Sequence, residues 1–276
     1  MINKKYKDRL FCLLFGNEEY KDNILSLYNA LCNTSYTNTD DIQIYTIEDV
    51  IYIKMKNDVS VLLDSFLYLW EQQSTFNPNM PIRGLLYFGK MYDKYITENH
   101  LNIYGKTLIK LPTPKYTVLY NGMDEQPAFM QLRLSDSFIN PDTSGDFEWT
   151  ANMINLNDGK NDDLLDKCQP LKEYMILINE IRKNSVSMGF EDAVDTAVTY
   201  CIEHNVLKSF LLKHRAEVLD VCITEYNEKS FVDGIREEGQ NLLATVVLRL
   251  RNGETPEQIL ASGVDAKTIE LAETIK

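Results

Sequence analysis

The hydrophobic pattern between residues 42 and 121 constrains the fold more than any other feature of the chain. Three apolar runs, rich in Ile, Val, Leu and Tyr, follow one another with only short polar breaks between them, at 42–55, 57–63 and 66–75. Runs of this length and composition are typical of β-strands. The two residues Asp64 and Ser65 between the last two runs predict a tight hairpin.

A helical pattern separates these runs from a further extended segment. Apolar residues adopt helical spacing from Ile82 to Ile96, with Asn79 as a candidate N-cap and Pro81 in the first turn. Segment 115–121 is again extended. A strand–helix–strand passage is a crossover connection, so we expect 115–121 to lie parallel to 67–74.

The flanking segments extend this pattern in both directions. A helix is expected at 18–31, and further strands are expected at 129–134 and 147–156. Beyond these, the chain has six candidate helices: 171–182, 190–204, 206–226, 237–251, 256–262 and 266–275. We therefore predict an α/β domain over residues 1–165, with a mixed sheet flanked by helices, followed by an all-helical region over residues 166–276.

Composition excludes several classes of protein. Apolar residues make up 44% and charged residues 25% of the chain, as in ordinary globular proteins. No stretch approaches the roughly 20 apolar residues that span a bilayer, and the basic N-terminus lacks the apolar region of a secretory signal. The five cysteines are odd in number and widely spaced. We therefore expect a cytoplasmic protein with reduced thiols and no membrane partner.

The net charge of −13 argues against strong general affinity for nucleic acid. Residues 1–140 hold 14 basic and 16 acidic side chains, whereas the remainder holds 14 basic and 25 acidic ones. The acidity therefore belongs to the C-terminal half. The N-terminal half is near neutral, which leaves room for a local basic face.

A candidate site follows from Asp58, Glu71 and Gln73. Asp58 opens one predicted strand, and Glu71 and Gln73 lie near the end of the next, 13 and 15 residues further on. Side chains alternate between the two faces of a strand, so Glu71 and Gln73 share a face, and Asp58 can meet them from the neighbouring strand. Taken singly, each residue has an equally good structural explanation: Asp58 as a turn residue where its strand begins, and Glu71 as a solvated residue of its strand.

Two carboxylates at the rim of a sheet form an oxygen-rich site that suits Mg²⁺ or Mn²⁺. The backbone carbonyl of Gln72 is a candidate third ligand. A divalent ion bound there can activate water and stabilise charge on a phosphate oxygen.

The pattern D-(x)12-E-x-Q, with its order of helix, three strands, helix and parallel strand, resembles the PD-(D/E)XK nuclease superfamily. A closer resemblance is to the recombination-promoting nuclease/putative transposase family, over roughly residues 7–240. It is carried by RLFCLLFGNEE, LSLYNALCNTSY, MKNDVSVLL, EQQSTFNPNMPIRGLLY, LPTPKYTVLYNG and LRLSDSF, and further along by LKEYMILINEIR, DAVDTAVTYCIEHNVLKSFLLKHRAEV and ITEYNEK.

The resemblance implies a Mg²⁺-dependent endonuclease that acts on double-stranded DNA, with Asp58 and Glu71 as metal ligands. Gln73 stands where the superfamily has lysine and offers a dipole in place of a positive charge. Glu18 or Glu19 resembles a further acidic position of such folds, and Glu19 is the preferred candidate. The alternative is a catalytically weak or inactive scaffold that binds DNA or a protein partner.

Three basic residues have two interpretations each. Arg83, one turn into the predicted helix, suits either a DNA phosphate or a salt bridge to a nearby carboxylate. Lys54 and Lys56 are candidate contacts to the DNA backbone, although exposed lysines on strands often serve solubility alone. The last two predicted helices resemble a helix-turn-helix pair but are too acidic to read DNA, so packing or self-association through the helical half is favoured.

Overall fold

A computed structural model describes residues 5–45, 58–63, 65–142, 144–262 and 264–275, with residues 5, 58, 223–241 and 261 described by their backbone alone. The chain divides into two compact units, residues 1–223 and 224–276. The unit that contains the sheet therefore extends to Ile223, well past the boundary at residue 165 that the sequence predicted.

Six strands of the described residues form one mixed sheet in the order β1-β2-β3-β4-β6-β5. Their bounds are β1 Gln43–Ile44, β2 Asp58–Leu63, β3 Phe66–Gln73, β4 Thr113–Tyr120, β5 Phe129–Arg133 and β6 Thr150–Asn155. β3 and β4 pair in parallel, as the crossover predicted, and β4 also pairs in parallel with β6. The remaining pairs are antiparallel.

The hairpin that joins β2 and β3 fixes the register of the site. Its antiparallel pairs run from Leu63 opposite Phe66 to Asp58 opposite Glu71. Ser65, in the turn, has the left-handed φ of 65° that tight hairpins require. The sequence therefore predicted both this turn and the two strands correctly, while residues 46–55 of the first predicted strand lie outside the described residues.

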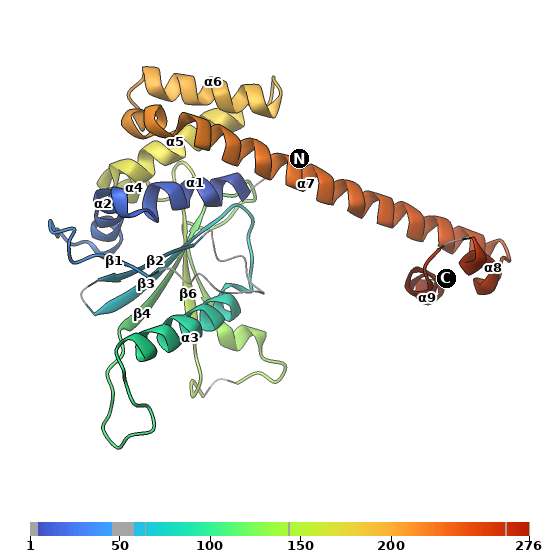
Figure 1. The fold of residues 1–276 in the computed structure, drawn as a ribbon, viewed down its shortest axis with the longest axis horizontal. Coiled ribbons are helices and arrows are strands. Elements are labelled where there is room, and N and C mark those ends of the chain that lie inside the picture. The colour runs from blue at the N-terminus through green and yellow to red at the C-terminus, as the bar shows by residue number, and fades with distance from the viewer. Residues whose placement is uncertain (1–4, 46–57, 64, 143, 263, 276) are drawn as a thin grey trace. The chain divides into compact units, whose positions relative to one another are not determined.

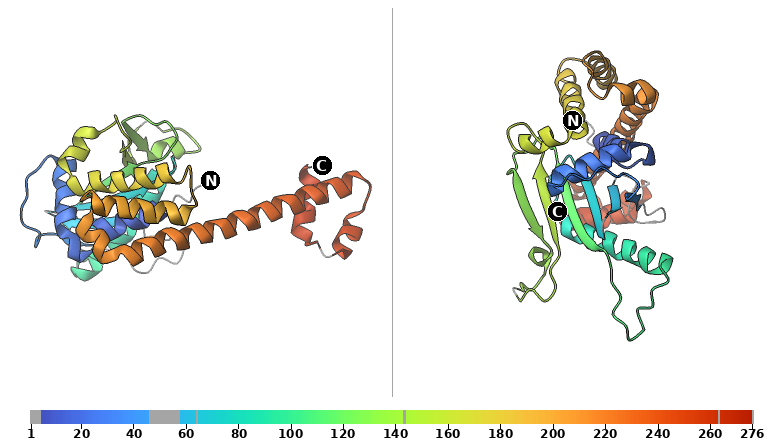
Figure 2. Two further views of the ribbon diagram at one scale, coloured as in Figure 1. Left: turned by 90° about the horizontal axis from the view of Figure 1, so that it is seen from above. Right: turned by 90° about the vertical axis from the view of Figure 1, so that its left-hand side faces the viewer.

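Helices cover both faces of the sheet, as Figure 1 and Figure 2 show. The helix α3 (Met80–Glu98) packs on one face, against β4, β5 and β6. On the other face α1 (Lys5–Phe15) packs against β2 and β3, and it also contacts α2 (Lys21–Cys32) and α5 (Gln169–Asn184). Residues at even positions of β3 therefore face α1, and those at odd positions face α3.

Two helical predictions need correction, and two further helices were not predicted. The first helix is α1, which the sequence pattern did not predict, and the predicted helix 18–31 is a short 3₁₀ turn η1 (Glu18–Tyr20) followed by α2. The helix α4 (Asp162–Lys167) is a further helix that the sequence analysis did not predict. The two helices predicted between residues 206 and 251 form one helix, α7 (Lys208–Arg251), whose backbone departs from helical geometry at His214.

The helices α6 (Phe190–Glu203), α8 (Pro256–Ala261) and α9 (Ala266–Ile275) agree with the predicted spans. In the second unit α8, α9 and the end of α7 enclose a small apolar cluster of Val246, Leu250, Ile259, Ile269 and Ala272. Self-association through this acidic region stays a prediction. Among the described helices, none combines the length and the apolar character needed to cross a bilayer.

The contact between α3 and the sheet depends on a glycine. A β-carbon added at Gly84 would lie 2.5 Å from the ring of Tyr116 on β4 and 2.8 Å from the indole nitrogen of Trp149. Gly89, on the same helix, has no neighbour within 4 Å of such an atom. The first position therefore requires the absence of a side chain, and the second does not.

We predict that Gly84→Ala lowers the free energy of unfolding by about 1–3 kcal/mol, because the methyl group displaces Tyr116 in a packed core. Gly89→Ala should raise it by about 0.5–1 kcal/mol through helix propensity alone. Urea denaturation of both variants measures the difference. Equal effects of the two substitutions would contradict the packing of α3 on β4.

Candidate functional site

Glu71 is an almost fully buried carboxylate near the end of β3, with 1% of its side chain exposed. Arg83 of α3 forms a salt bridge to its Oε1 at 2.5 Å. Gln73 Nε2 donates to the same oxygen at 2.6 Å, and the Tyr116 hydroxyl of β4 donates to Oε2 at 2.5 Å. Three side chains from three elements therefore hold this carboxylate in one orientation.

Burial and pairing act on the charge of Glu71 in opposite directions. Burial raises the pKa of the Glu71 carboxyl above its usual value, while Arg83, Tyr116 and Gln73 each lower it. The net effect is a raised pKa, since removal of the charged form from water is the largest contribution. A buried carboxylate that a cation compensates is a common feature of functional sites.

Position 58 stands directly opposite Glu71 in the sheet. The backbone N–H of Asn121, which follows β4, donates to the carbonyl of Gln73. Backbone groups alternate in direction along a strand, so the N–H and C=O groups of Glu71 also point toward β4 and away from β2. Asp58 and Glu71 are therefore a non-hydrogen-bonded antiparallel pair, the closer of the two kinds, in which Cα atoms stand about 4.5 Å apart. The structure describes Asp58 by its backbone alone.

The side chain and the backbone carbonyl of Gln72 point in different directions. Because successive carbonyls along a strand alternate in direction, the Gln72 carbonyl turns toward the β2 side, where Asp58 begins its strand. The side chain lies on the α1 face, is fully buried, and donates through Nε2 to Asn121 Oδ1 at 2.7 Å. Its Oε1 has no hydrogen-bond partner among the described residues.

A polar cluster beneath the sheet fixes this end of β3. Asn121 is fully buried at the end of β4, and its backbone carbonyl accepts from Arg182 of α5. Its Oδ1 also accepts from the buried amine of Lys7 on α1 at 3.5 Å, and Tyr174 of α5 donates to the Lys7 carbonyl at 3.0 Å. The cluster ties α1 and α5 to the strand ends that carry the site.

The predicted acidic residues near the N-terminus contact other partners. Glu19 lies in η1 and forms an exposed ion pair with Lys213 of α7, and Glu18 pairs with Lys21 at 2.7 Å. Lys213 lowers the pKa of the Glu19 carboxyl. Within the described part of the chain, neither Glu18 nor Glu19 forms a hydrogen bond or an ion pair with Glu71 or with its partners Arg83, Gln73 and Tyr116. Lys54 and Lys56 lie outside the described residues.

Sequence reasoning left two partners open for Arg83 and missed Tyr116. The structure places Arg83 on Glu71, which agrees with the salt-bridge interpretation, and its guanidinium also donates to the Tyr87 hydroxyl at 2.9 Å. Tyr116 and Val118 lie two residues apart on β4, so their side chains share one face of the strand. That spacing does not reveal that the Tyr116 hydroxyl contacts Glu71. Asn121 entered the sequence analysis only as the last residue of the extended segment 115–121.

The donor set at this rim fits a divalent cation. Its candidate ligands are the Glu71 carboxylate, the Gln72 carbonyl and the residue at position 58, all of which offer oxygen, the element that Mg²⁺ and Mn²⁺ prefer. A carboxylate offers about four acceptor positions, of which Arg83, Gln73 and Tyr116 occupy three. Among the residues whose side chains are described, no group of three or more His, Cys, Asp or Glu residues forms a metal site.

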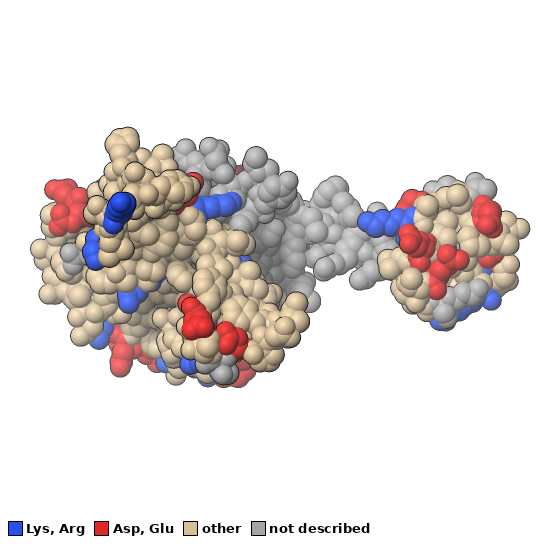
Figure 3. Space-filling view, turned by 90° about the horizontal axis from the view of Figure 1, so that it is seen from below, with Lys and Arg blue, Asp and Glu red and all other residues tan. Residues whose placement is uncertain are grey.

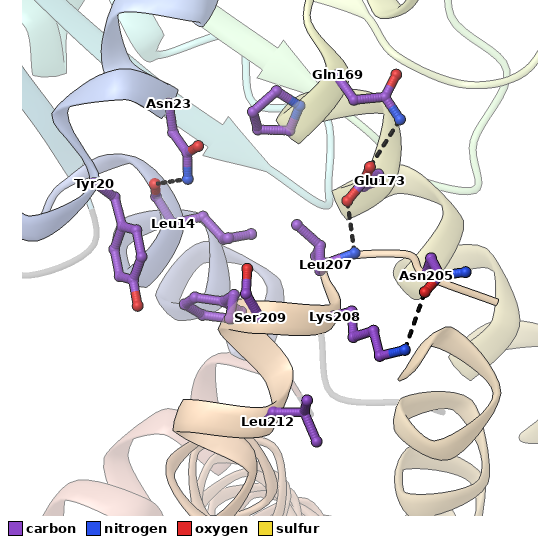
Figure 4. Close-up of a pocket in the computed structure, with 12 residues that line it drawn as sticks. Leu14, Tyr20, Asn23, Gln169, Glu173, Asn205, Leu207, Lys208, Ser209 and Leu212 are labelled. Atoms are coloured by element: carbon purple, nitrogen blue, oxygen red, sulfur yellow. Dashed lines mark hydrogen bonds between the residues drawn. The ribbon is translucent and has the colours of Figure 1, made fainter. Parts of the chain in front are cut away.

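A pocket of about 610 Å³ lies among the helices of the first unit (Figure 4). Residues of α1, α2, α5 and α7 line it, and Glu173 accepts from the Leu207 backbone at 2.6 Å and from Gln169 at 2.7 Å. Its rim has two left-handed residues, Asn205 and Leu207. The Glu173 carboxylate is thus engaged in holding the loop that enters α7.

Surface charge on the α3 side is mixed. Figure 3, which views the molecule from below, shows Lys and Arg side chains of the first unit scattered among Asp and Glu on a largely uncharged surface. The face in view therefore lacks a continuous basic band among its described residues.

Comparison of the chain with family models, with curated proteins and with solved structures gave no match. The family resemblance of the sequence is therefore a hypothesis that rests on the motifs themselves and on the geometry of this site.

We predict that the Glu71–Arg83 pair is strongly coupled. In EDTA, Arg83→Gln and Glu71→Gln should each destabilise the protein, and the double variant should recover much of the loss, with a coupling of about 1–3 kcal/mol. The reason is that either single change leaves a buried charge without its partner. Urea denaturation of the four proteins gives the coupling.

The matched control is the exposed pair of Lys172 and Asp166, which has a similar distance of 2.6 Å. Its cycle, with Lys172→Gln and Asp166→Asn, should give a coupling within about 1 kcal/mol of zero. A coupling at Glu71–Arg83 no larger than this control would show that the pair does not form in solution.

Proposed function

We propose that this protein is a Mg²⁺-dependent DNA endonuclease of the PD-(D/E)XK type, related to the recombination-promoting nuclease/putative transposase family. The reaction is hydrolysis of phosphodiester bonds in double-stranded DNA, in association with DNA recombination. The observation that carries the proposal is the register of the β2–β3 hairpin, which sets Asp58 directly opposite Glu71.

The order of elements around this pair supports the same conclusion. Among the described residues, a helix, three strands, a crossover helix and a parallel strand follow one another as α2, β1 to β3, α3 and β4. This is the arrangement that the sequence resemblance implies. Fold and function are separate questions, however, so the proposal depends on the residues at the rim and not on the architecture alone.

Each residue of the rim has a role in this proposal. Asp58 and Glu71 would hold the cation, with the Gln72 carbonyl as a third ligand. A bound Mg²⁺ or Mn²⁺ lowers the pKa of a water and stabilises charge on the phosphate. Gln73 lies on the same face as Glu71 and orients the water or the phosphate through its amide.

DNA would approach the rim at the ends of β3 and β4. Lys54 and Lys56 precede Asp58 in the sequence and are candidates for contacts to the phosphate backbone. The acidic C-terminal half would limit indiscriminate binding, because excess negative charge repels DNA. The expected affinity is therefore modest and strongly dependent on salt.

A second candidate function is a catalytically inactive scaffold that binds DNA or a protein partner. It is favoured by the pairing of Glu71, whose two oxygens already accept from Arg83, Gln73 and Tyr116. Glutamine at position 73 also lacks the positive charge of a catalytic lysine. Only the first function predicts cleavage, whereas the second predicts binding of DNA or of a protein partner without cleavage.

We predict that the purified protein nicks supercoiled plasmid in Mg²⁺ or Mn²⁺ and that EDTA abolishes the reaction. Asp58→Asn and Glu71→Gln should each lower the rate at least about 100-fold, because each removes a charged metal ligand. These isosteric changes are preferable to alanine at the buried Glu71, since alanine would leave a cavity beside Arg83. Gel electrophoresis of the plasmid forms measures the rate.

Glu203→Gln, at an exposed position of α6, is the matched control and should cut at the wild-type rate. Equal cleavage by all variants would identify a contaminating nuclease. DNA binding without cleavage by any variant would favour the scaffold.

A further inference from the structure

The Glu71 carboxylate and the Arg83 guanidinium are bound to each other across two elements, at 2.5 Å. Glu71 has 1% of its side chain exposed, whereas Arg83 has 33% exposed. The carboxylate is therefore confined, and the guanidinium has a route to solvent. A buried carboxylate needs a compensating cation, and in this structure α3 supplies it.

A divalent ion on Oε1 of Glu71 would compete with Arg83 for the same space, because Arg83 and Gln73 already occupy both acceptor positions of that oxygen. Metal–oxygen distances for Mg²⁺ are about 2.0–2.1 Å, so an ion on Oε1 would lie close to the guanidinium nitrogen bound there. Two cations at this separation repel each other strongly where water is excluded. Oε1 also accepts from Gln73, and Oε2 accepts from the Tyr116 hydroxyl. Gln73 and Tyr116 are neutral and can stay in place, whereas Arg83 cannot do so without a cost.

We infer that Arg83 is a built-in counter-ion of Glu71, which a divalent metal ion must displace in order to bind. This inference rests on the proposed metal site and adds its regulation: the metal exchanges with Arg83 rather than adding to an empty carboxylate. Arg83 is thus a positioning residue that keeps Glu71 ordered in the metal-free protein and lowers its affinity for metal. The Tyr87 hydroxyl, which accepts from Arg83 at 2.9 and 3.3 Å, stabilises the metal-free arrangement.

The test is titration of the EDTA-treated full-length protein with Mn²⁺ by isothermal calorimetry. Arg83→Gln should bind Mn²⁺ roughly 10- to 100-fold more tightly than the wild type, within the usual range of coupling between two binding events. Arg133→Gln, an exposed position on β5, is the matched control and should bind as the wild type does. Glu71→Gln should abolish this binding in both the wild-type and the Arg83→Gln background.

A second variant covers the case in which Arg83→Gln does not fold. Tyr87→Phe keeps the guanidinium but removes one hydroxyl that holds it, and it should tighten Mn²⁺ binding severalfold. The rise in melting temperature on addition of Mn²⁺ is an independent readout, and it should be larger for both variants than for the wild type.

The outcomes separate this inference from the proposed function. If Mn²⁺ binds through Glu71, and more tightly in Arg83→Gln, while no protein cuts plasmid, the inference stands and the nuclease proposal fails. If cleavage depends on metal but Arg83→Gln binds Mn²⁺ equally or more weakly, the inference alone is overturned. Absence of Glu71-dependent Mn²⁺ binding in every variant would overturn both.

Discussion

The antiparallel pairing of β2 with β3 sets position 58 opposite Glu71, and the proposed chemistry depends on that register. A slip of one residue would exchange the two faces of a strand and separate the acidic positions. The apolar residues of the hairpin prevent such a slip. Tyr68 and Trp70 pack on the α1 face, whereas Leu67 and Leu69 join the core beneath α3. The core thus fixes the geometry of the site at the end of the same strands.

The sheet alone does not complete the site. Glu71 comes from β3, but its partners come from α3 and β4, so the crossover brings Arg83 and Tyr116 to the carboxylate. Gly84, one residue after Arg83, lets α3 approach Tyr116 closely enough for both contacts. On the opposite face Asn121 and Gln72 tie the strand ends to α1 and α5 through buried hydrogen bonds. The rim is therefore held from both sides of the sheet.

Much of the fold could be predicted from the sequence, because alternation with a period of two and helical spacing are local properties. The strands β2 to β6, the helix α3 and the facing positions of Asp58 and Glu71 followed from that pattern. The helix α1 had its own signal, since Tyr6, Leu10, Phe11 and Leu14 are spaced for one helical face and are all buried. The partner of Arg83 could not be predicted, because it depends on how α3 is rotated on the sheet. The extent of the first unit was equally hidden, because the acidic segment near residue 160 gives no sign that later helices pack on α1 and α2.

Gln73 and Arg83 contact the same oxygen of Glu71, so the residue type at one position constrains the residue type at the other. A lysine at position 73 would place a second positive charge beside Oε1, where Arg83 already lies at 2.5 Å. Two cations on the same carboxylate oxygen would repel each other strongly where water is excluded. Glutamine donates to the same oxygen at 2.6 Å without adding charge. Arg83 of α3 therefore supplies the positive charge beside Glu71, and Gln73 adds a hydrogen bond without a second charge.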